Sequence, residues 1–303
     1  MLTAGLGTRL QPLSFVRAKP AVPLAGQSLI SRIIRGLARQ DVRQLVLNLH
    51  YLPETITAHV GDGREFDVRV RYSWEFPILG SAGGPRKALP LLPDEDFFIV
   101  NGDTLTDVDL KGLVANHRQH GALVTLAVME NRWPGRYGGV VTDSRGIVHG
   151  FVPRSPSAPG YHFVGVQMVN PSAFASLAPG EPAETNSGIY RTLIADHPGS
   201  VRAFLCEGEF WDVGTPSDYL DAALSISRAE GHAAPPIGHR SHVHETARLV
   251  DSVLWDDVEV GAGASLDRCI VADRVKIPAG ASFRNCAILQ GEGDLVAAEI
   301  SNG

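Results

Sequence analysis

The stretch LISRIIRGLARQDVRQLVLNLHY, Leu29–Tyr51, decides the fold class because it places an amphipathic helix directly before a buried strand. Apolar residues in LISRIIRGLARQD recur at helical spacing, and QLVLNLHY is a nearly continuous apolar run, as in a strand covered on both faces. The alternation continues to about Pro216; LKGLVANHRQHG, for example, predicts a helix capped by Gly121, and ALVTLAVM predicts the strand after it. We therefore predict an α/β fold with a Rossmann-like, mostly parallel sheet and helices on both faces.

The C-terminal part of the chain is built on a repeat of 17 residues. SVLWDDVEVGAGASLDR, residues 252–268, aligns with CIVADRVKIPAGASFRN, residues 269–285, so that apolar positions coincide and Gly263 falls on Gly280. A weaker copy, with Leu249 in the same phase, precedes them. Short β-runs at a fixed interval, with glycine at the corners, predict the stacked coils of a parallel β-helix, and a period near three sixes resembles the hexapeptide left-handed form.

These two patterns divide the chain into an α/β domain over residues 1–230, a proline-containing linker over 231–240 and a short left-handed β-helix over 241–303. The 303 residues, 44% apolar and 20% charged, are enough for two globular domains. The net charge of −6 argues against a nucleic-acid partner, and no apolar run approaches the ~18 residues of a membrane span. With no signal-peptide pattern at the start and three scattered cysteines, we expect a cytoplasmic protein that binds neither nucleic acid nor membrane.

Near the start, GLGTRL combines two glycines with a basic residue, and Lys19 follows ten residues later. A dinucleotide fingerprint would need a third glycine where Leu10 stands. A P-loop would need a serine or threonine after its lysine, whereas Pro20 follows Lys19. Two interpretations remain open: a glycine turn with Arg9 in solvent, or a cradle whose backbone N–H groups meet phosphates while Arg9 and Lys19 supply positive charge.

The longer stretch GLGTRLQPLSFVRAKPAVPLAG, Gly5–Gly26, resembles the signature of the nucleoside-diphosphate-sugar pyrophosphorylases, the sugar-1-phosphate nucleotidylyltransferases. Four later stretches resemble further segments of this family: LGSAGG at 79–84 its base-contacting loop, VNGDTL at 100–105 its metal-binding turn, RYGGV at 136–140 its sugar site, and FWDVGTPSDYL at 210–220 its second metal-binding aspartate. The match covers nearly the whole chain and is closest to the mannose-1-phosphate guanylyltransferase-like and N-acetylmuramate-phosphate uridylyltransferase-like branches.

The resemblance implies an Mg²⁺-dependent enzyme that transfers a nucleotidyl group from a nucleoside triphosphate to a sugar 1-phosphate and releases pyrophosphate. The sugar-phosphate oxygen attacks the α-phosphorus in line, so positioning and electrostatic stabilisation dominate the catalysis. The resemblance assigns Arg9 to the leaving pyrophosphate and Lys19 to the phosphates of both substrates. It makes Asp103 and Asp212 the Mg²⁺ ligands, and carboxylates at strand ends suit this hard cation.

The remaining residues that the resemblance assigns would bind the two substrates. The nucleotide-binding set is Leu2, Ala4, Gly5, Gly7, Thr8, Gly83 and Gly102, and the sugar-phosphate set is Gly138, Arg154, Gly165 and Glu184. The family's Glu-Lys-Pro is replaced here by a proline and Arg154, and arginine binds a phosphate bidentately without being equivalent to lysine. Since that glutamate is missing, the sugar stays open, and Glu184 is either a replacement sugar contact or a solvated loop residue.

Several functions remain in competition. GTP with mannose or heptose 1-phosphate is favoured because the resemblance extends to the β-helix tail; the alternative is a UTP- or dTTP-using enzyme. A non-catalytic regulatory paralogue disagrees with the retention of both basic residues and both aspartates, and a hexapeptide acyltransferase disagrees with a tail of only about three coils. An unpaired β-helix end exposes strand edges, so we expect a homo-oligomer. The first strand, Met1–Ala4, is shorter than in relatives, and we expect that its start is mis-set.

Overall fold

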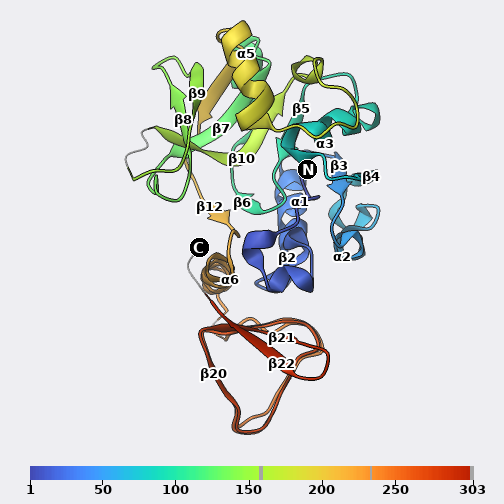
Figure 1. Cartoon of the computed structure of the whole chain (residues 1–303), viewed down its shortest axis with the longest axis vertical. Helices are drawn as coiled ribbons and strands as arrows, with labels where there is room; N and C mark the ends of the chain where they lie inside the picture. Colours follow the sequence, from blue (N-terminus) through green and yellow to red (C-terminus); the bar gives the residue numbers. More distant parts are fainter. Residues whose placement is uncertain (157–159, 233, 301–303) are drawn as a thin grey trace. The chain divides into compact units, whose positions relative to one another are not determined.

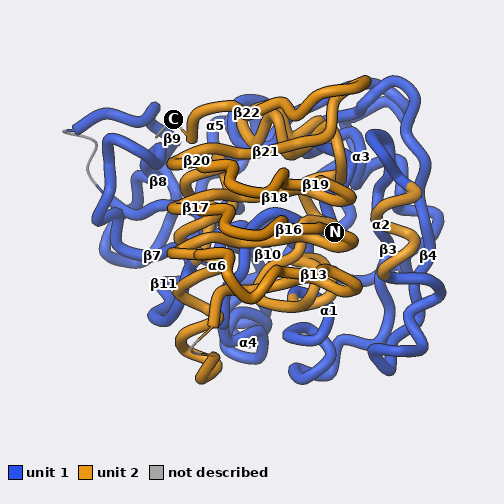
Figure 2. The backbone as a smooth tube through the Cα atoms, turned by 90° about the horizontal axis from the view of Figure 1, so that it is seen from below, with its two compact units in different colours: residues 1–5, 33–53, 60–210 blue, residues 6–32, 54–59, 211–303 orange. Residues whose placement is uncertain are grey.

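The computed structural model describes residues 1–156, 160–232 and 234–300. Residues 157–159 after Arg154, residue 233 in the predicted linker and residues 301–303 at the end of the predicted β-helix lie outside the described residues. Contacts divide the chain into two compact units (Figure 2). The first unit comprises residues 1–5, 33–53 and 60–210, and the second comprises residues 6–32, 54–59 and 211–303. The glycine loop therefore begins in the first unit and continues in the second.

The main sheet of the first unit has the strand order β11-β7-β10-β8-β9, with β5 also paired to β10. Both β5 and β7 pair antiparallel with β10, and β11 pairs parallel with β7, so that β5, β7 and β11 all run in one direction. The strands span Phe97–Val100 (β5), Val124–Glu130 (β7), Gly139–Thr142 (β8), Val148–Val152 (β9), Tyr161–Val169 (β10) and Val201–Leu205 (β11).

The first residues of the chain join this sheet to a parallel pair of strands, β3 (Gln44–Leu49) and β4 (Arg69–Trp74). Leu2 forms a parallel bridge with Asn101, just after β5, and the ammonium of Met1 donates a hydrogen bond of 2.7 Å to the carbonyl oxygen of Val46 in β3. The predicted Rossmann-like α/β fold is confirmed, but within the described part of the main sheet only β7 and β11 pair parallel, because β10 pairs antiparallel with β5, β7 and β8, and β8 pairs antiparallel with β9. The sequence pattern did not show this antiparallel β10 at the centre of the sheet.

A cavity of about 370 Å³ lies in the first unit between β3 and β5. Its lining includes Met1, Leu37 and Leu45 on one side and Phe97 and Ile99 on the other. Residues 1–3 therefore occupy only one end of the space between the two strands. Because the ammonium of Met1 is buried at this point, its pKa is lowered from 8.0 to about 5.

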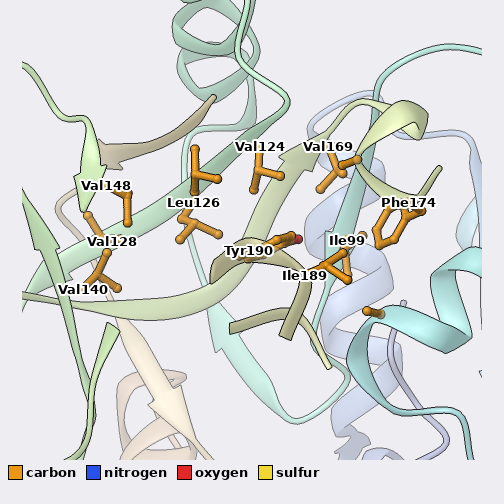
Figure 3. Close-up of a cluster of buried hydrophobic side chains, with 13 residues drawn as sticks. Ile99, Val124, Leu126, Val128, Val140, Val148, Val169, Phe174, Ile189 and Tyr190 are labelled. Atoms are coloured by element: carbon orange, nitrogen blue, oxygen red, sulfur yellow. The ribbon is translucent and has the colours of Figure 1, made fainter. Parts of the chain in front are cut away.

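Helices cover both faces of the main sheet, as predicted. Along β7, Val124, Leu126 and Val128 pack with Tyr190 in one buried cluster (Figure 3), whereas the intervening Thr125 bonds to His117 at 2.8 Å. Successive side chains of a strand point to opposite faces, so the helices carrying Tyr190 and His117 lie on opposite sides. The helices span Leu29–Arg39 (α1), Pro53–Val60 (α2), Gly80–Ala88 (α3), Leu110–His120 (α4), Tyr190–Asp196 (α5) and Pro216–Ala229 (α6).

Local sequence signals explain where two of these helices begin and end. The side chain of Asp109 accepts a hydrogen bond from the backbone N–H of Lys111 at the start of α4, and Gly121 ends that helix in the left-handed conformation, with φ +57°. Thr215 and Asp218 form a capping box at the start of α6, where Pro216 occupies the first turn. In the described part of the chain, no helix has both the length and the apolar character that a membrane crossing requires.

The second unit contains the stacked coils of the parallel β-helix (Figures 1 and 2). Its strands pair at the predicted offset: Val253 with Ile270, Leu249 with Leu266, and Val260 with Ile277. Gly263 and Gly280 both have positive φ, +66° and +71°, at equivalent corners. The strands span His242–Val243 (β13), Arg248–Val250 (β14), Val253–Leu254 (β15), Glu259–Val260 (β16), Ser265–Asp267 (β17), Ile270–Val271 (β18), Lys276–Ile277 (β19) and Ser282–Arg284 (β20).

The last coil is closed by an antiparallel pair, β21 (Cys286–Gln290) and β22 (Leu295–Glu299). The interior of the coils is filled by one apolar side chain above another, including Leu254, Leu266, Val271 and Ile288. Four short strands complete the inventory: β1 (Pro23–Leu24) and β2 (Gln27–Ser28), which form an antiparallel hairpin, β6 (Thr104–Thr106) and β12 (Phe210–Asp212).

Candidate active site

Three stretches of the second unit bring the predicted phosphate-binding residues together. The ammonium of Lys19 lies 4.0 Å from Oδ1 of Asp212, and both side chains are about nine-tenths buried, at 9% and 11% exposure. A Cβ atom at Gly214 would lie 3.1 Å from Oδ2 of Asp212 and 3.4 Å from Nη1 of Arg9. Gly214 therefore lies between the aspartate and the guanidinium, and the absence of a side chain there leaves space beside both groups.

The conformation of the glycine loop explains how Arg9 and Lys19 reach the same region. Gly7 has φ +63°, and its carbonyl oxygen accepts a hydrogen bond of 2.9 Å from the N–H of Leu10. A Cβ atom at Gly7 would lie 3.3 Å from the Cβ of Lys19, so the loop folds back against the segment that carries this lysine. Leu10 and Leu13 are fully buried and hold the turn, while Arg9 is exposed.

In the first unit, the turn after β5 gathers four of the predicted residues. The N–H of Gly102 donates to the carbonyl oxygen of Leu2 at 2.9 Å, and Asp103 follows in the chain. Gly165 accepts a hydrogen bond of 2.8 Å from the N–H of Asn101, and a Cβ atom at Gly165 would collide with the hydroxyl of Thr104. Gly165, which has φ +82°, is therefore the residue type that allows β10 to approach the Asp103 turn.

A second group of predicted residues lies on the hairpin of β8 and β9. Gly139 is paired with Val152, and a Cβ atom at Gly138 would lie 2.9 Å from the carbonyl oxygen of Val152 and 3.8 Å from the backbone nitrogen of Arg154. Gly138 and Arg154 are therefore neighbours across the hairpin, and Arg154 is exposed. The structure brings together the glycine and the arginine that the sequence assigned to the sugar phosphate.

Aromatic residues flank Gly138 within the first unit. Tyr137 stacks on His162, with ring centroids 5.0 Å apart, and Phe210 packs edge-on against both rings. His162 and Phe210 line a pocket of about 700 Å³, together with Trp133 and Cys206. Burial lowers the pKa of His162, so its ring is neutral at pH 7.

Glu184 and Gly83 lie at the segment that the sequence assigned to the nucleotide base. The carboxylate of Glu184 accepts a hydrogen bond of 2.5 Å from the hydroxyl of Ser81. A Cβ atom at Gly83 would collide with the carbonyl oxygen of Glu181, so this glycine is needed for close packing of α3 against residues 181–183. Glu184, predicted as a sugar contact, is thus placed beside the base-contacting segment.

Sequence reasoning missed two buried polar residues that support the nucleotide-binding segments. The side chain of Asn48 accepts a 2.6 Å hydrogen bond from the N–H of Thr3 and donates at 2.7 Å to Glu75. The other carboxylate oxygen of Glu75 accepts at 2.8 Å from the N–H of Leu79, just before α3. The sequence signal was the asparagine inside the apolar run QLVLNLHY. A strand buries an asparagine side chain only when the hydrogen bonds of its amide are satisfied.

The described residues contain no group of three or more histidine, cysteine, aspartate or glutamate side chains placed to hold a metal by themselves. Asp103 and Asp212, which the sequence assigned to Mg²⁺, are carboxylates, and proteins bind this cation through one or two carboxylates together with substrate phosphates and water. Burial raises the pKa of the Cys206 thiol to about 11, so this residue lacks the thiolate that nucleophilic catalysis would need.

Comparison with known proteins identifies the two parts of the chain. Residues 1–229 match the family model described as nucleotidyl transferase. The chain belongs to the nucleotidyl transferase family. Residues 234–283 of this nucleotidyl transferase match a second model, GlmU-like C-terminal hexapeptide, which agrees with the predicted left-handed β-helix.

Curated relatives of this nucleotidyl transferase share about a quarter to a third of its residues. It is 26% identical to the mannose-1-phosphate guanylyltransferase of Mycobacterium tuberculosis, over 90% of this chain and 79% of the relative. It is 31% identical to the mannose-1-phosphate guanylyltransferase catalytic subunit beta of Dictyostelium discoideum, over 73% of this chain and 62% of the relative. Among solved structures, HddC from Yersinia pseudotuberculosis superposes with a TM-score of 0.65 at 23% identity, over 74% of this chain and 97% of HddC, which shows the shared fold.

Proposed function

We propose that this nucleotidyl transferase joins a nucleoside triphosphate, GTP by preference, to a mannose- or heptose-type sugar 1-phosphate, producing a nucleotide sugar and pyrophosphate. The observation that carries the proposal is the convergence of Arg9, Lys19 and Asp212 around Gly7 and Gly214 in the second unit. This arrangement places two positively charged side chains, one carboxylate and two glycines without side chains in one region, and it is suited to binding a triphosphate. The guanine preference is supported by the names of the relatives from M. tuberculosis and D. discoideum.

In the proposed reaction each side chain has a separate task. Arg9, exposed at the loop, faces charge that develops on the leaving pyrophosphate, and its guanidinium offers paired N–H donors. Lys19 neutralises the phosphates that must approach each other, and the nearby Asp212 carboxylate fixes the orientation of its ammonium. We assign Mg²⁺ to Asp103 and Asp212, where it would neutralise phosphate oxygens when bound.

The sugar-phosphate end of the proposal rests on the hairpin and on β10. Arg154 would grip the phosphate of the sugar, while the backbone at Gly138 and Gly165 would lie against the ring. Glu184, which bonds to Ser81, would order the base-contacting segment in this scheme. We also propose a cytoplasmic homo-oligomer, because among the described residues β13 and β14 each pair with one strand only, and an unpaired strand edge can pair with another subunit.

A second candidate is uridylyl transfer. It is favoured by one relative, the UTP–glucose-1-phosphate uridylyltransferase of a Synechocystis species, which is 27% identical over 86% of this chain. The two candidates share the chemistry of Arg9 and Lys19 and differ only in the base and the sugar.

The test is a matrix of nucleoside triphosphates against sugar 1-phosphates, read by pyrophosphate release. We expect the fastest release with GTP and a mannose- or heptose-type 1-phosphate, and loss of that release in Arg9→Ala. Arg64→Ala, which removes an arginine that is 90% exposed and paired only with Asp62 in the described structure, is the matched control and should release pyrophosphate normally. Release with UTP alone would replace guanylyl by uridylyl transfer, and no release with any pair would refute the proposal.

A further inference from the structure

Arg17 lies in the glycine-rich signature but points into the β-helix of the second unit. Its Nε donates to Oδ2 of Asp273 at 2.7 Å and its Nη2 donates to Oδ1 of the same carboxylate at 2.7 Å, a bidentate pair. The same Nη2 donates at 2.6 Å to Oδ2 of Asp256. One guanidinium from the loop that carries Lys19 thus holds two successive coils.

The repeat explains why two carboxylates meet there. Asp256 and Asp273 are one period apart, so they occupy the same position in neighbouring coils, where like charges would repel. The side chains of Arg17, Asp256 and Asp273 are only 10%, 20% and 13% exposed, so that water screens them weakly. Burial alone would lower the pKa of Arg17, but hydrogen bonds and charge from Asp273 and Asp256 outweigh it and raise that pKa.

A second connection fixes the other end of the same segment. The indole of Trp255 donates at 2.8 Å to the hydroxyl of Tyr219, which donates at 2.6 Å to the carbonyl oxygen of Pro23. Trp255 and Tyr219 are both fully buried, and the Arg17 guanidinium lies 5.5 Å from the centre of the Trp255 ring. The segment from Arg17 to Pro23, with Lys19 inside it, is therefore attached to the β-helix at both ends.

We infer that Arg17 is a positioning residue, through which the first coils of the β-helix hold Lys19 in the geometry that phosphate transfer needs. The inference rests on the proposed function of Lys19 and extends it, because it gives the β-helix a part in the chemical step. Arg17 touches no substrate in this scheme; it acts through Ala18, the one residue that separates it from Lys19 in the chain. Loss of the ion pairs would loosen the lysine without removing any charge from the phosphate site.

The first experiment measures kcat and KM for both substrates in Arg17→Met, Asp273→Asn and the double variant. We expect kcat to fall on the order of tenfold to a hundredfold in each single variant, because small displacements of catalytic groups cost that much. The kcat of the double variant should be no lower than that of Arg17→Met. The kcat of Arg17→Lys should lie between those of Arg17→Met and the wild type. Arg240→Met is the control: Arg240 forms the same bidentate pair, at 2.6 and 2.7 Å, with Asp257 of the β-helix, yet it lies at the end of the predicted linker and not in the glycine loop.

The second experiment measures backbone hydrogen exchange without substrate, so that it does not depend on activity. Exchange in residues 6–22 should be faster in Arg17→Met and Asp273→Asn than in the wild type, while exchange in β7 of these two variants stays unchanged. In Arg240→Met, exchange in residues 6–22 should match the wild type. Unchanged kcat in folded Arg17→Met, or additive losses in the double variant, would overturn the positioning role. If the wild type releases no pyrophosphate, the proposed function fails, while the exchange data still decide whether the β-helix orders the loop. Should Arg17→Met not fold, Asp273→Asn and Arg17→Lys carry the test.

Discussion

In a chain produced with Met1 as its first residue, acetylation of the Met1 amine should remove a large part of the pH dependence of stability. The ammonium of Met1 is buried, which lowers its pKa from 8.0 to about 5. At 1.36 kcal/mol for each pKa unit, that shift corresponds to ~4 kcal/mol of unfolding free energy. Between pH 8 and pH 5 the unfolded chain holds this proton and the folded chain does not, so stability rises with pH and is lost on acidification.

The acetylated chain is a close match for the free one. The acetamide keeps an N–H that can donate to the carbonyl oxygen of Val46, and the cavity of about 370 Å³ beside Met1 offers room for the acetyl group. Urea unfolding of both forms at pH 8 and pH 5 gives the two free-energy differences. We expect the free chain to lose several kcal/mol more than the acetylated chain. Equal losses would show that the amine does not remain neutral in the folded protein, and the reasoning from burial would be refuted.

Three further predictions concern the metal, the sugar phosphate and the thiols. Asp103→Asn and Asp212→Asn should each lower turnover by several orders of magnitude without changing the melting temperature, and near-normal turnover of both at limiting Mg²⁺ would remove the metal assignment. Arg154→Ala should raise KM for the sugar 1-phosphate by roughly ten- to a hundredfold, since a hydrogen bond to a charged group is worth roughly 1.5–3 kcal/mol, while KM for the nucleotide stays the same; an unchanged sugar-phosphate KM would exclude this arginine. A thiol reagent at pH 8 should react only after denaturation, because burial raises the pKa of each thiol, and fast labelling of the native chain would contradict this for Cys206, Cys269 and Cys286.

The β-helix was predictable because its information is local and repeated. One period fixes both the side-chain phase and the pairing register, so that aligning the chain with itself already pairs Val253 with Ile270. The antiparallel β10 was not predictable in this way. Its direction is set by pairing with β5 and β7, which lie far away in sequence. An apolar run predicts a buried strand but does not indicate whether that strand is parallel or antiparallel to its neighbours.

The candidate site shows the same limit. Gly7, Arg9 and Lys19 could be named because a short motif contains all three. Asn48 could not, because its role depends on Thr3 and Glu75, which only the fold brings within hydrogen-bond distance. Glu184 was predicted as a sugar contact or a solvated loop residue, whereas in the structure its carboxylate accepts a hydrogen bond from the hydroxyl of Ser81, which lies 103 residues earlier and belongs to another segment.

Arg17 marks the largest gap between motif and structure. The sequence analysis assigned no role to Arg17, which lies in the same glycine-rich signature as Arg9 and Lys19. The structure turns its side chain toward Asp256 and Asp273, more than two hundred residues away along the chain. No pattern in a single sequence distinguishes an arginine that binds a substrate phosphate from one that forms ion pairs with two carboxylates of its own chain.

The antiparallel closing strand β22 has a consequence for how this protein can change in length during evolution. Duplication of any 17-residue block between β15 and β20 would add one coil and leave every later side chain in phase, whereas an insertion of another length would turn core residues outward. New coils cannot be added after β21, because β22 already occupies its outer edge. Growth of the tail is therefore confined to the coils before β21, and each duplicated block would also copy Asp256 or Asp273, so that the added coil keeps a carboxylate at that position.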